Sequence, residues 1–239
     1  MSTTPKNSEF ENLRALFLEL DFITPLENVT EEQIPWLQEL LANERKLRHD
    51  FRIRRLLSGC GIKPHQIRTF EGFDWSFNPK LPKNDILAFR NSRWIEEARN
   101  IVFIGDAGVG KSHFAKSLCY DAIQKGESAY FISAFDLIGK LKKSPQPETK
   151  VNYFGNIRVL CIDELGYTQQ NKDAGDLLFQ IIAKRSETLP TIITTNLPPK
   201  QWGSIFAGPA ATAMLDRLNY NGKFITMDGA SYRMGSKRK

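Results

Sequence analysis

A single stretch limits the possible folds of this chain more than any other. Residues Gly105 to Ser112 read G-x-x-x-x-G-K-S, the spacing of a phosphate-binding P-loop. The apolar run Asn100–Ile104 before it is typical of a buried strand, and His113–Lys125 after it is typical of a helix that ends at Gly126. In that setting the glycines let backbone N–H groups converge, and the helix N-terminus adds a positive dipole end. The stretch therefore predicts a site for the phosphates of a nucleotide.

Within this loop, two side chains have roles that the chemistry suggests. Lys111 is expected to reach the β- and γ-phosphates, and the hydroxyl of Ser112 is expected to bind Mg²⁺. Asp106, whose carboxylate would repel a triphosphate, is expected to face solvent. The alternative interpretation is an ordinary glycine-rich turn. The expected cofactors are ATP and Mg²⁺, with the nucleotide held by Gly105, Asp106, Ala107, Gly108, Val109, Gly110, Lys111, Ser112 and His113.

Composition narrows the class of protein. At 239 residues, with 41% apolar and 25% charged residues, the chain can form one α/β core and a smaller appendage. No apolar run is long enough to span a bilayer, and the polar stretch Met1–Phe10 lacks a signal-peptide core, so we expect a cytoplasmic protein without a membrane partner. The three cysteines are too scattered for a disulfide framework or a zinc site. The net charge of +6 favours a polyanionic partner.

The chain is expected to contain three regions. These are a helical N-terminal domain over residues 1–61, an aromatic linker over 62–82 and a P-loop ATPase domain over 83–239. In the first region, apolar residues at helical spacing predict a helix over 12–22, and the capping-box pattern Thr30–Gln33 predicts the start of a second. Pro35 either bends that second helix or lies in the first turn of a fresh one, and Ser58–Gly61 ends it.

Two basic clusters are candidate DNA contacts. The clusters comprise Arg52, Arg54 and Arg55 near the end of the second helix, and Lys140, Lys142 and Lys143 near the end of a helix expected after Ser133. Such side chains bind nucleic acid by neutralising phosphates and releasing counterions. No base-reading motif accompanies them, so binding would be largely independent of DNA sequence. The alternative is that both clusters are ordinary solvated helix surfaces.

The linker is unusually aromatic, with Phe70, Phe73, Trp75 and Phe77 close together. These side chains would either cover the base of a nucleotide or pack on the surface of the following domain, and for most of them packing is the favoured alternative. After the linker, Asn84 is expected to cap a helix that runs to Glu97.

The remainder alternates between strands and helices, which predicts a parallel sheet with helices on both faces. Beyond the strand before the P-loop, strands are expected over residues 128–132, 158–163 and 191–195. Helices are expected over 133–143 and 173–187. Cys161 lies inside one of the apolar strands and is expected to be a small core residue.

Two acidic residues follow the strand that begins near Val159. Because ligands bind at the carboxyl ends of parallel strands, Asp163 and Glu164 are expected at the nucleotide site. Asp163 would hold Mg²⁺, and Glu164 would polarise the attacking water, which favours hydrolysis over transfer to another substrate. Asn196, after the next strand, would contact the γ-phosphate or that water. The alternative for the two acids is a strand that ends in ordinary surface carboxylates.

Arginines are candidates for stabilising charge in the transition state. Arg217 is the first candidate and would act on the nucleotide of a neighbouring subunit, although the spacing equally fits an arginine on a helix surface. Arg185 and Arg233 are weaker candidates for related roles.

Taken together, several motifs resemble those of IstB-type helper ATPases of insertion-sequence transposition, which belong to the AAA+ class and are similar to DnaC helicase loaders. The motifs are Arg52–Arg55, Phe70–Phe77, Gly110–His113, Ile162–Gly166, Thr194–Pro198, Leu215–Leu218 and Ser231–Arg233. The resemblance implies a parallel five-stranded sheet flanked by helices and preceded by a small helical domain. It also implies that Arg217 is a trans-acting arginine finger and that Arg233 lies near a second sensor position.

The same resemblance implies partners: duplex DNA, further copies of the chain in a helical or ring-like oligomer, and a cognate transposase that the oligomer recruits or activates. A DnaC-like helicase loader that acts with single-stranded DNA is the nearest alternative. A P-loop kinase for a small molecule and a nucleotide-gated binding protein with little turnover are more distant ones.

Overall fold

The computed structural model describes residues 4–23, 28–91, 93–166, 172–204 and 210–232. The chain forms two compact units, Met1–Arg55 and Leu56–Lys239, and the division between them falls within the long helix α2 (Ile34–Gly59). The boundary predicted from the sequence, after residue 61, lies just beyond the end of that helix. None of the described helices is long and apolar enough to cross a membrane.

The first unit is built on α1 (Thr4–Glu19) and the larger part of α2. Its core is a cluster in which side chains of the first helix meet one side chain of the second: Leu13, Leu16, Phe17, Leu20 and Leu41. The capping box forms as predicted, with the Thr30 N–H donating to Gln33 Oε1 at 3.0 Å beside a short 3-10 turn (Glu31–Gln33). Pro35 lies in the first turn of α2, so the helix starts afresh.

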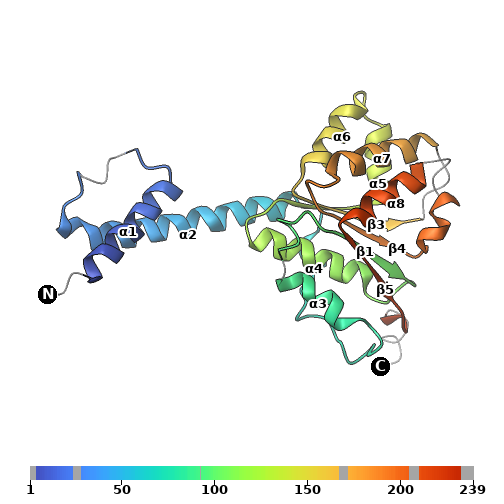
Figure 1. Cartoon of the computed structure of the whole chain (residues 1–239), viewed down its shortest axis with the longest axis horizontal. Helices are drawn as coiled ribbons and strands as arrows, with labels where there is room; N and C mark the ends of the chain where they lie inside the picture. The colour runs from blue at the N-terminus through green and yellow to red at the C-terminus, as the bar shows by residue number, and fades with distance from the viewer. Residues whose placement is uncertain (1–3, 24–27, 92, 167–171, 205–209, 233–239) are drawn as a thin grey trace. The chain divides into compact units, whose positions relative to one another are not determined.

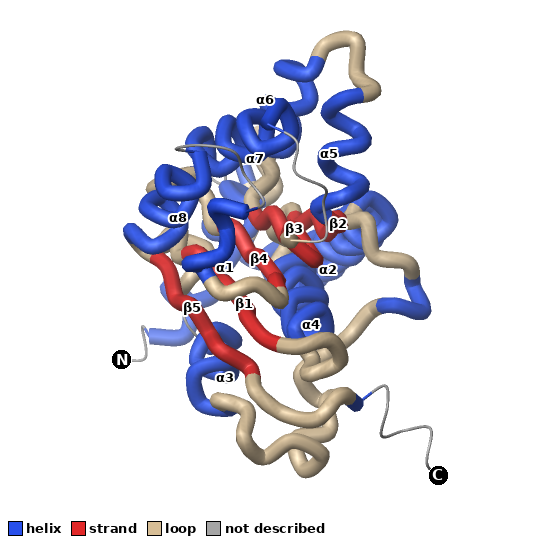
Figure 2. Tube along the Cα trace, turned by 90° about the vertical axis from the view of Figure 1, so that its right-hand side faces the viewer, coloured by secondary structure: helices blue, strands red, loops and turns tan. Residues whose placement is uncertain are grey.

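The second unit contains a five-stranded sheet, which confirms the predicted fold class. Its strands are β1 (Asn100–Gly105), β2 (Ala129–Ser133), β3 (Val159–Leu165), β4 (Thr191–Thr195) and β5 (Gly222–Met227). All neighbouring pairs are parallel, and the order is β2-β3-β4-β1-β5 (Figure 2). The first and third strands in the chain are therefore both central, and their carboxyl ends come to the same edge of the sheet.

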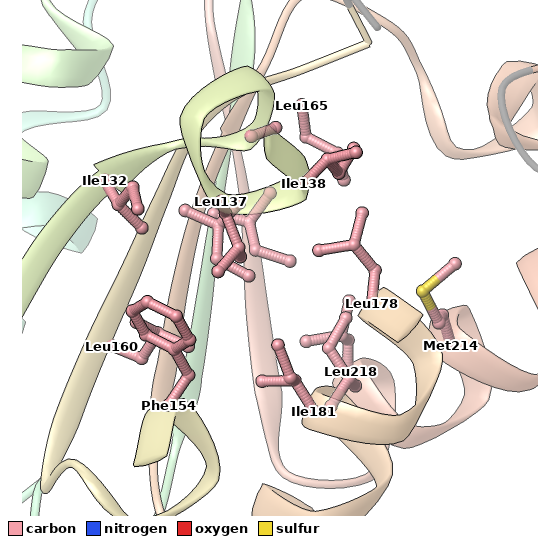
Figure 3. Close-up of a cluster of buried hydrophobic side chains, with 14 of the residues drawn as sticks. Ile132, Leu137, Ile138, Phe154, Leu160, Leu165, Leu178, Ile181, Met214 and Leu218 are labelled. Atoms are coloured by element: carbon pink, nitrogen blue, oxygen red, sulfur yellow. The ribbon is translucent and has the colours of Figure 1, made fainter. Parts of the chain in front are cut away.

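Helices cover both faces of this sheet (Figure 1). One face packs against α5 (Ala134–Lys142), α6 (Pro147–Asn156), α7 (Lys172–Arg185) and α8 (Ala210–Tyr220). Leu137, Phe154, Leu178 and Met214 bring these four helices into one buried cluster (Figure 3). The other face packs on α4 (Lys111–Gln124), where the Phe103 ring lies 6.4 Å from that of Phe114. Successive side chains of a strand thus pack against helices on opposite faces of the sheet, as the two-residue repeat of a strand requires.

In the first unit, α1 (Thr4–Glu19) differs from the helix predicted over 12–22. Three elements of the second unit also differ from the sequence predictions. The helix expected over 84–97 is α3 (Lys83–Asn91), so Asn84 lies inside it and does not cap it. Trp94 and Ile95, expected on that helix, are buried in a turn that the Arg99 N–H closes by donating to the Trp94 carbonyl at 2.9 Å. Helix α6 was not predicted, and the fifth strand was not located in the sequence. Cys161 is buried in β3, as predicted.

Candidate nucleotide site

The P-loop joins β1 to α4 in the predicted arrangement. Two of its glycines have left-handed backbone angles, with φ of 86° at Gly108 and 110° at Gly110. A Cβ at Gly110 would also lie 2.9 Å from the Phe73 ring, and one at Gly108 would collide with the hydroxyl of Ser231. Glycine is therefore required at both positions by conformation and by space, and the loop closes tightly against its surroundings.

The side chain of Lys111 contacts the backbone at the start of this loop. Its Nζ donates to the carbonyl oxygens of Gly105 and Asp106, each at 2.7 Å. The ammonium group is thus beside the concavity of the P-loop, where the phosphates of a nucleotide would provide stronger acceptors. The Asp106 side chain is exposed, as predicted.

Asp163 lies beside the start of α4. The Ser112 hydroxyl donates to Asp163 Oδ1 at 2.8 Å, and the Thr194 hydroxyl donates to the same oxygen at 2.5 Å. Asp163 is 8% exposed, so this carboxylate is held by hydroxyl groups in a largely buried position. A hydroxyl and a carboxylate are the oxygen ligands that Mg²⁺ prefers, and Mg²⁺ usually binds nucleotide phosphates at the same time. Ser112 and Asp163 therefore fit the metal predicted for them.

Glu164 follows Asp163 at an irregularity in the sheet. Ile162 pairs with Ile193 and Leu165 pairs with Thr195, so two acidic residues of β3 lie opposite Thr194 alone. Glu164 has a left-handed backbone with φ of 57°, which is uncommon for a residue with a side chain. Its N–H donates to the Thr194 hydroxyl at 2.9 Å, and its side chain is exposed on the wall of the nucleotide pocket.

Asn196 comes from the end of β4 and lines the same pocket. Its Oδ1 is buried and accepts no hydrogen bond from any described residue. An unsatisfied buried oxygen is costly, so this amide would gain from a donor that enters the pocket, such as a water beside a bound nucleotide.

The pocket itself encloses about 640 Å³. Five segments line it: the P-loop with the start of α4, the end of β3, the end of β4, the aromatic region before the domain, and the residues after β5. The volume lies within the range of small-molecule sites, and the strand ends are where parallel sheets bind ligands. The structure thus brings Ala107–Ser112 of the P-loop, His113, Glu164 and Asn196 to one cavity, whereas Gly105 and Asp106 do not line it. Asp163 is joined to this cavity through its hydrogen bond with Ser112.

The aromatic region packs on the following domain, which was the favoured alternative for most of its side chains. Phe73 and Trp75 pack on Phe114 of α4, with ring centroids 4.4 Å and 5.1 Å away. Phe73 also lines the nucleotide pocket together with Phe77. Packing therefore fixes the segment, and two of its rings remain at the cavity where a base could stack.

His113 attaches this region to α4. Its Nε2 lies 2.9 Å from the Thr69 carbonyl oxygen, and its ring meets that of Phe73 edge-on at 5.0 Å. Burial lowers the pKa of His113, and the nearby cations Arg68 and Lys116 lower it further. The imidazole is therefore held neutral, and Nε2 is the nitrogen that carries the proton donated to Thr69.

The segment after β5 closes the other side of the pocket. The Tyr232 N–H donates to the Gly108 carbonyl at 3.1 Å, and the Tyr232 ring meets Phe77 edge-on at 5.0 Å. Asn78 Nδ2 donates to the Asp228 carbonyl at 3.1 Å. These contacts tie the residues before the sheet to those after it. Arg233, predicted to lie near the nucleotide, is outside the described residues.

Arg217 does not line the pocket of its own chain. It lies on α8, where its guanidinium donates to the Ala213 carbonyl at 3.1 Å and lies 4.8 Å from the centre of the Phe179 ring. Its carbonyl accepts a 3.4 Å hydrogen bond from Asn100, the first residue of β1, whereas the P-loop follows the last residue. Arg217 therefore lies toward the end of the sheet opposite the nucleotide pocket.

The prediction that Arg185 is a catalytic arginine is wrong. Arg185 is fully buried and donates to the Pro190, Ile157 and Phe154 carbonyls at 2.5, 2.6 and 3.0 Å. A guanidinium enclosed in this way cannot reach a nucleotide in another subunit. Its role is structural, since it ties the segments that lead into β3 and β4.

The basic clusters lie in different units. Lys140, Lys142 and Lys143 line a groove of about 1250 Å³ at the β2 edge of the sheet, which Lys150 also lines. Lys140 Nζ donates to the Tyr130 hydroxyl at 3.0 Å. In the first unit, Arg52, Arg54 and Arg55 are all exposed on α2.

Hydroxyl groups have a part in the site that the sequence pattern did not reveal. Thr194 bonds to both acidic residues of β3, and the Thr195 hydroxyl donates to the Leu165 carbonyl at 2.6 Å. In the sequence, this pair of threonines indicates only β-branched strand residues. The available signal was the position of two hydroxyls directly before Asn196, at the end of a strand expected beside the acids.

Comparison with known proteins identifies relatives that are named for ATP binding. The family model described as IstB-like ATP binding protein matches residues 24–239. A protein of Bacillus thuringiensis subsp. berliner, named as an ATP-binding protein of insertion sequence IS232, is 34% identical over 220 residues, covering 90% of this chain and 83% of its own. A Geobacillus stearothermophilus protein, named likewise for IS5376, is 37% identical over 175 residues, covering 72% and 70%.

Solved structures share the fold at lower identity. The crystal structure of DnaI has a TM-score of 0.60 at 20% identity and covers 72% of this chain and 95% of its own. That of the DnaC helicase loader has a TM-score of 0.51 at 24% identity and covers 61% and 87%. The second unit therefore has an AAA+ fold.

The P-loop, the paired acids and the polar residue after β4 meet in one cavity, which is the arrangement of an ATPase site. The family match extends over nearly the whole chain, and relatives above 30% identity are matched over most of their length. The chain is an ATPase, and it belongs to the family of IstB-like ATP-binding proteins.

Proposed function

We propose that this chain assembles on duplex DNA in its ATP-bound state and assists a transposase of an insertion sequence, with hydrolysis resetting the assembly. The observation that carries the proposal is the relationship to proteins named for insertion sequences, joined to the candidate hydrolytic residues at one pocket. ATP would be bound with Mg²⁺ on Ser112 and Asp163, and Glu164 would polarise the attacking water.

DNA contact is supported by the two basic clusters. The groove lysines are joined by Lys150 and face a single lining acid, Asp136, which already accepts from Ser133 at 2.7 Å. A groove with four cations and one engaged carboxylate suits a phosphate backbone. The three arginines on α2 are a second candidate contact in the other unit.

Assembly is supported by the position of Arg217. Because this arginine lies away from the pocket of its own chain, it is free of a role there and would complete the pocket of a neighbouring copy. A cation from a second subunit would make hydrolysis depend on assembly.

The hydrolytic role is tested by two single variants and their mixture. Glu164→Gln should abolish turnover and leave ATP bound, whereas Glu96→Gln, at an exposed acid outside the pocket, should not. Arg217→Ala should also abolish turnover without weakening ATP binding. Mixing the two inactive variants should restore part of the activity, because some interfaces then combine an intact Glu164 with an intact Arg217. No recovery on mixing, together with weaker ATP binding by Arg217→Ala, would contradict action in trans.

The DNA role is tested by salt dependence. Replacing Lys140, Lys142 and Lys143 by Ala should lower the log–log salt slope of duplex binding by about one unit for each phosphate that is no longer neutralised. A control that removes Lys63, Lys80 and Lys125, which are exposed outside the groove, changes the net charge equally and should leave the slope unchanged. Replacing Arg52, Arg54 and Arg55 by Ala, and comparing the salt slope with that of the same three-lysine control, tests the second basic cluster. Stronger binding to single-stranded than to duplex DNA would favour the helicase-loader alternative.

A further inference from the structure

We propose that Thr194 is a positioning residue for hydrolysis, whose hydroxyl sets the two acids of β3 in their working positions. The inference rests on the ATPase activity and adds a residue to it. Thr194 is completely buried and does not line the nucleotide pocket, so it acts through other side chains.

The backbone of β3 is irregular at the two acids. In a regular strand, consecutive side chains point to opposite faces of the sheet, and only one of two neighbouring acids would face the nucleotide. Here Asp163 and Glu164 together lie opposite one residue of β4, which is the pattern of a β-bulge. The bulge brings both acids to the same site, because Asp163 bonds to Ser112 and Glu164 lines the pocket.

The bulge requires Glu164 to hold a left-handed backbone, with φ of 57°. This conformation is unfavourable for any residue with a Cβ, so the surrounding structure must stabilise it. The contact that does so is the hydrogen bond from the Glu164 N–H to the Thr194 hydroxyl, at 2.9 Å. Glutamate is thereby kept where the backbone conformation would otherwise favour glycine.

The same hydroxyl fixes the other acid. It donates its proton to Asp163 Oδ1 at 2.5 Å, on the oxygen that also accepts from Ser112 at 2.8 Å. The Thr194 hydroxyl thus accepts a hydrogen bond from the Glu164 N–H and donates one to the Asp163 carboxylate. No solvent is in contact with Thr194 to replace either bond, because its exposed fraction is zero.

The test compares two replacements of nearly equal size. Thr194→Val keeps the shape and removes the hydroxyl, and Thr194→Ser keeps the hydroxyl and removes a methyl group. We expect the valine variant to lose roughly 10–100-fold in kcat, the usual effect of removing a supporting partner of this kind. Its affinity for a fluorescent ATP analogue should stay near that of the unaltered protein, since the P-loop is untouched. The serine variant should recover most of the kcat.

A matched control lies on the same strand. Thr191 is 1% exposed, and its hydroxyl accepts from Arg185 Nε at 3.0 Å near the other end of β4. Thr191→Val therefore also removes a buried, bonded hydroxyl, and it should not change kcat at temperatures where it is folded. Amide hydrogen exchange gives a second readout: the Glu164 N–H should exchange faster in Thr194→Val than in Thr194→Ser.

The outcomes are distinct. An unchanged kcat in Thr194→Val would overturn the proposal, as would equal losses in the valine and serine variants, which would indicate packing. A fall in ATP affinity that matches the fall in kcat would also overturn it. Absence of turnover in the unaltered protein would overturn the hydrolytic assignment and this inference together, whereas the other outcomes concern Thr194 alone.

Discussion

Arg185 is a buried cation that donates to neutral oxygens. Besides the carbonyls of Pro190, Ile157 and Phe154, its Nε donates to the hydroxyl of Thr191 at 3.0 Å. Burial lowers its pKa to about 9. The five N–H groups of a guanidinium suit this position, because several carbonyls from different segments converge on one point.

Replacing Arg185 by Met should therefore destabilise the second unit strongly. Methionine fills the space but leaves those buried carbonyls without donors, and we expect a loss of about 3 kcal/mol or more. Thermal unfolding should shift down by roughly 6–12 °C for a unit of this size. Arg158→Ala is the control: it removes a partly exposed arginine that lies 3.8 Å from Glu127 and should change stability by less than about 1 kcal/mol. Equal effects of the two variants would contradict the structural role of Arg185.

The roles of individual residues were predictable where a short sequence motif is sufficient to indicate them. The order glycine, lysine and serine after an apolar run predicted the nucleotide loop, and two acids after another run predicted the second half of the site. Arg185 was not predictable, because nothing in its neighbours in the sequence shows that the chain will enclose it. Thr194 was missed for a related reason: its two bonds depend on a bulge in the neighbouring strand.

Among the elements, the aromatic segment before the sheet is attached to α4 by a titratable residue. His113 is held neutral against the Thr69 carbonyl, and its pKa is lowered chiefly by burial. In the unfolded chain, His113 becomes protonated as the pH falls through its ordinary pKa of 6.5, whereas in the folded state it becomes protonated only at a lower pH. This contribution to stability is complete above pH 6.5 and is lost as the pH falls toward the lowered pKa.

The attachment of this segment should consequently weaken as the pH falls from neutral to below 6.5. We expect the unaltered protein to lose thermal stability over this window more steeply than His113→Gln, which keeps an N–H donor and does not titrate. The control His49→Gln removes an exposed histidine of the first unit and should retain the full pH dependence. Identical pH profiles for the unaltered protein and His113→Gln would contradict the prediction.

Elements were predicted best where the pattern was strong. Continuous apolar runs located β1, β3 and β4, and Ser133 capped α5 as expected, with its hydroxyl accepting from the Asp136 N–H at 3.0 Å. The fifth strand begins Gly222-Lys223, and α6 begins with a proline and contains Gly155, so neither has a clear pattern. The helix expected over 84–97 was too long because Trp94 and Ile95 are buried by a turn and not by helical periodicity.

Among the described residues, each of the two units has a core of its own. That of the first unit contains Leu13, Leu16, Phe17, Leu20 and Leu41, and that of the second centres on the sheet. The order of the sheet depends on pairings between strands far apart in the chain, so composition and periodicity could not supply it. The resemblance of several motifs to a known family implied a parallel sheet of five strands, and the order of those strands came only from the structure.

Separate cores should respond separately to substitution. Leu41 is 1% exposed in the first core, and Leu41→Ala should destabilise it by about 2–5 kcal/mol. Hydrogen exchange should then accelerate in the first unit, and ATP affinity should stay unchanged. Leu137→Ala, at a fully buried position in the second core, should accelerate exchange around the sheet. Weakened ATP binding in Leu41→Ala would show that the cores are coupled.

The hydrogen bond from Tyr232 to Gly108 has a consequence for synthesis of the protein. β5 pairs with β1, and the pocket draws on residues from Ile67 to Tyr232. A nascent chain cannot close that cavity until residue 232 has left the ribosome. The complete cavity therefore forms late in synthesis, after the P-loop and the ends of β3 and β4 have already emerged.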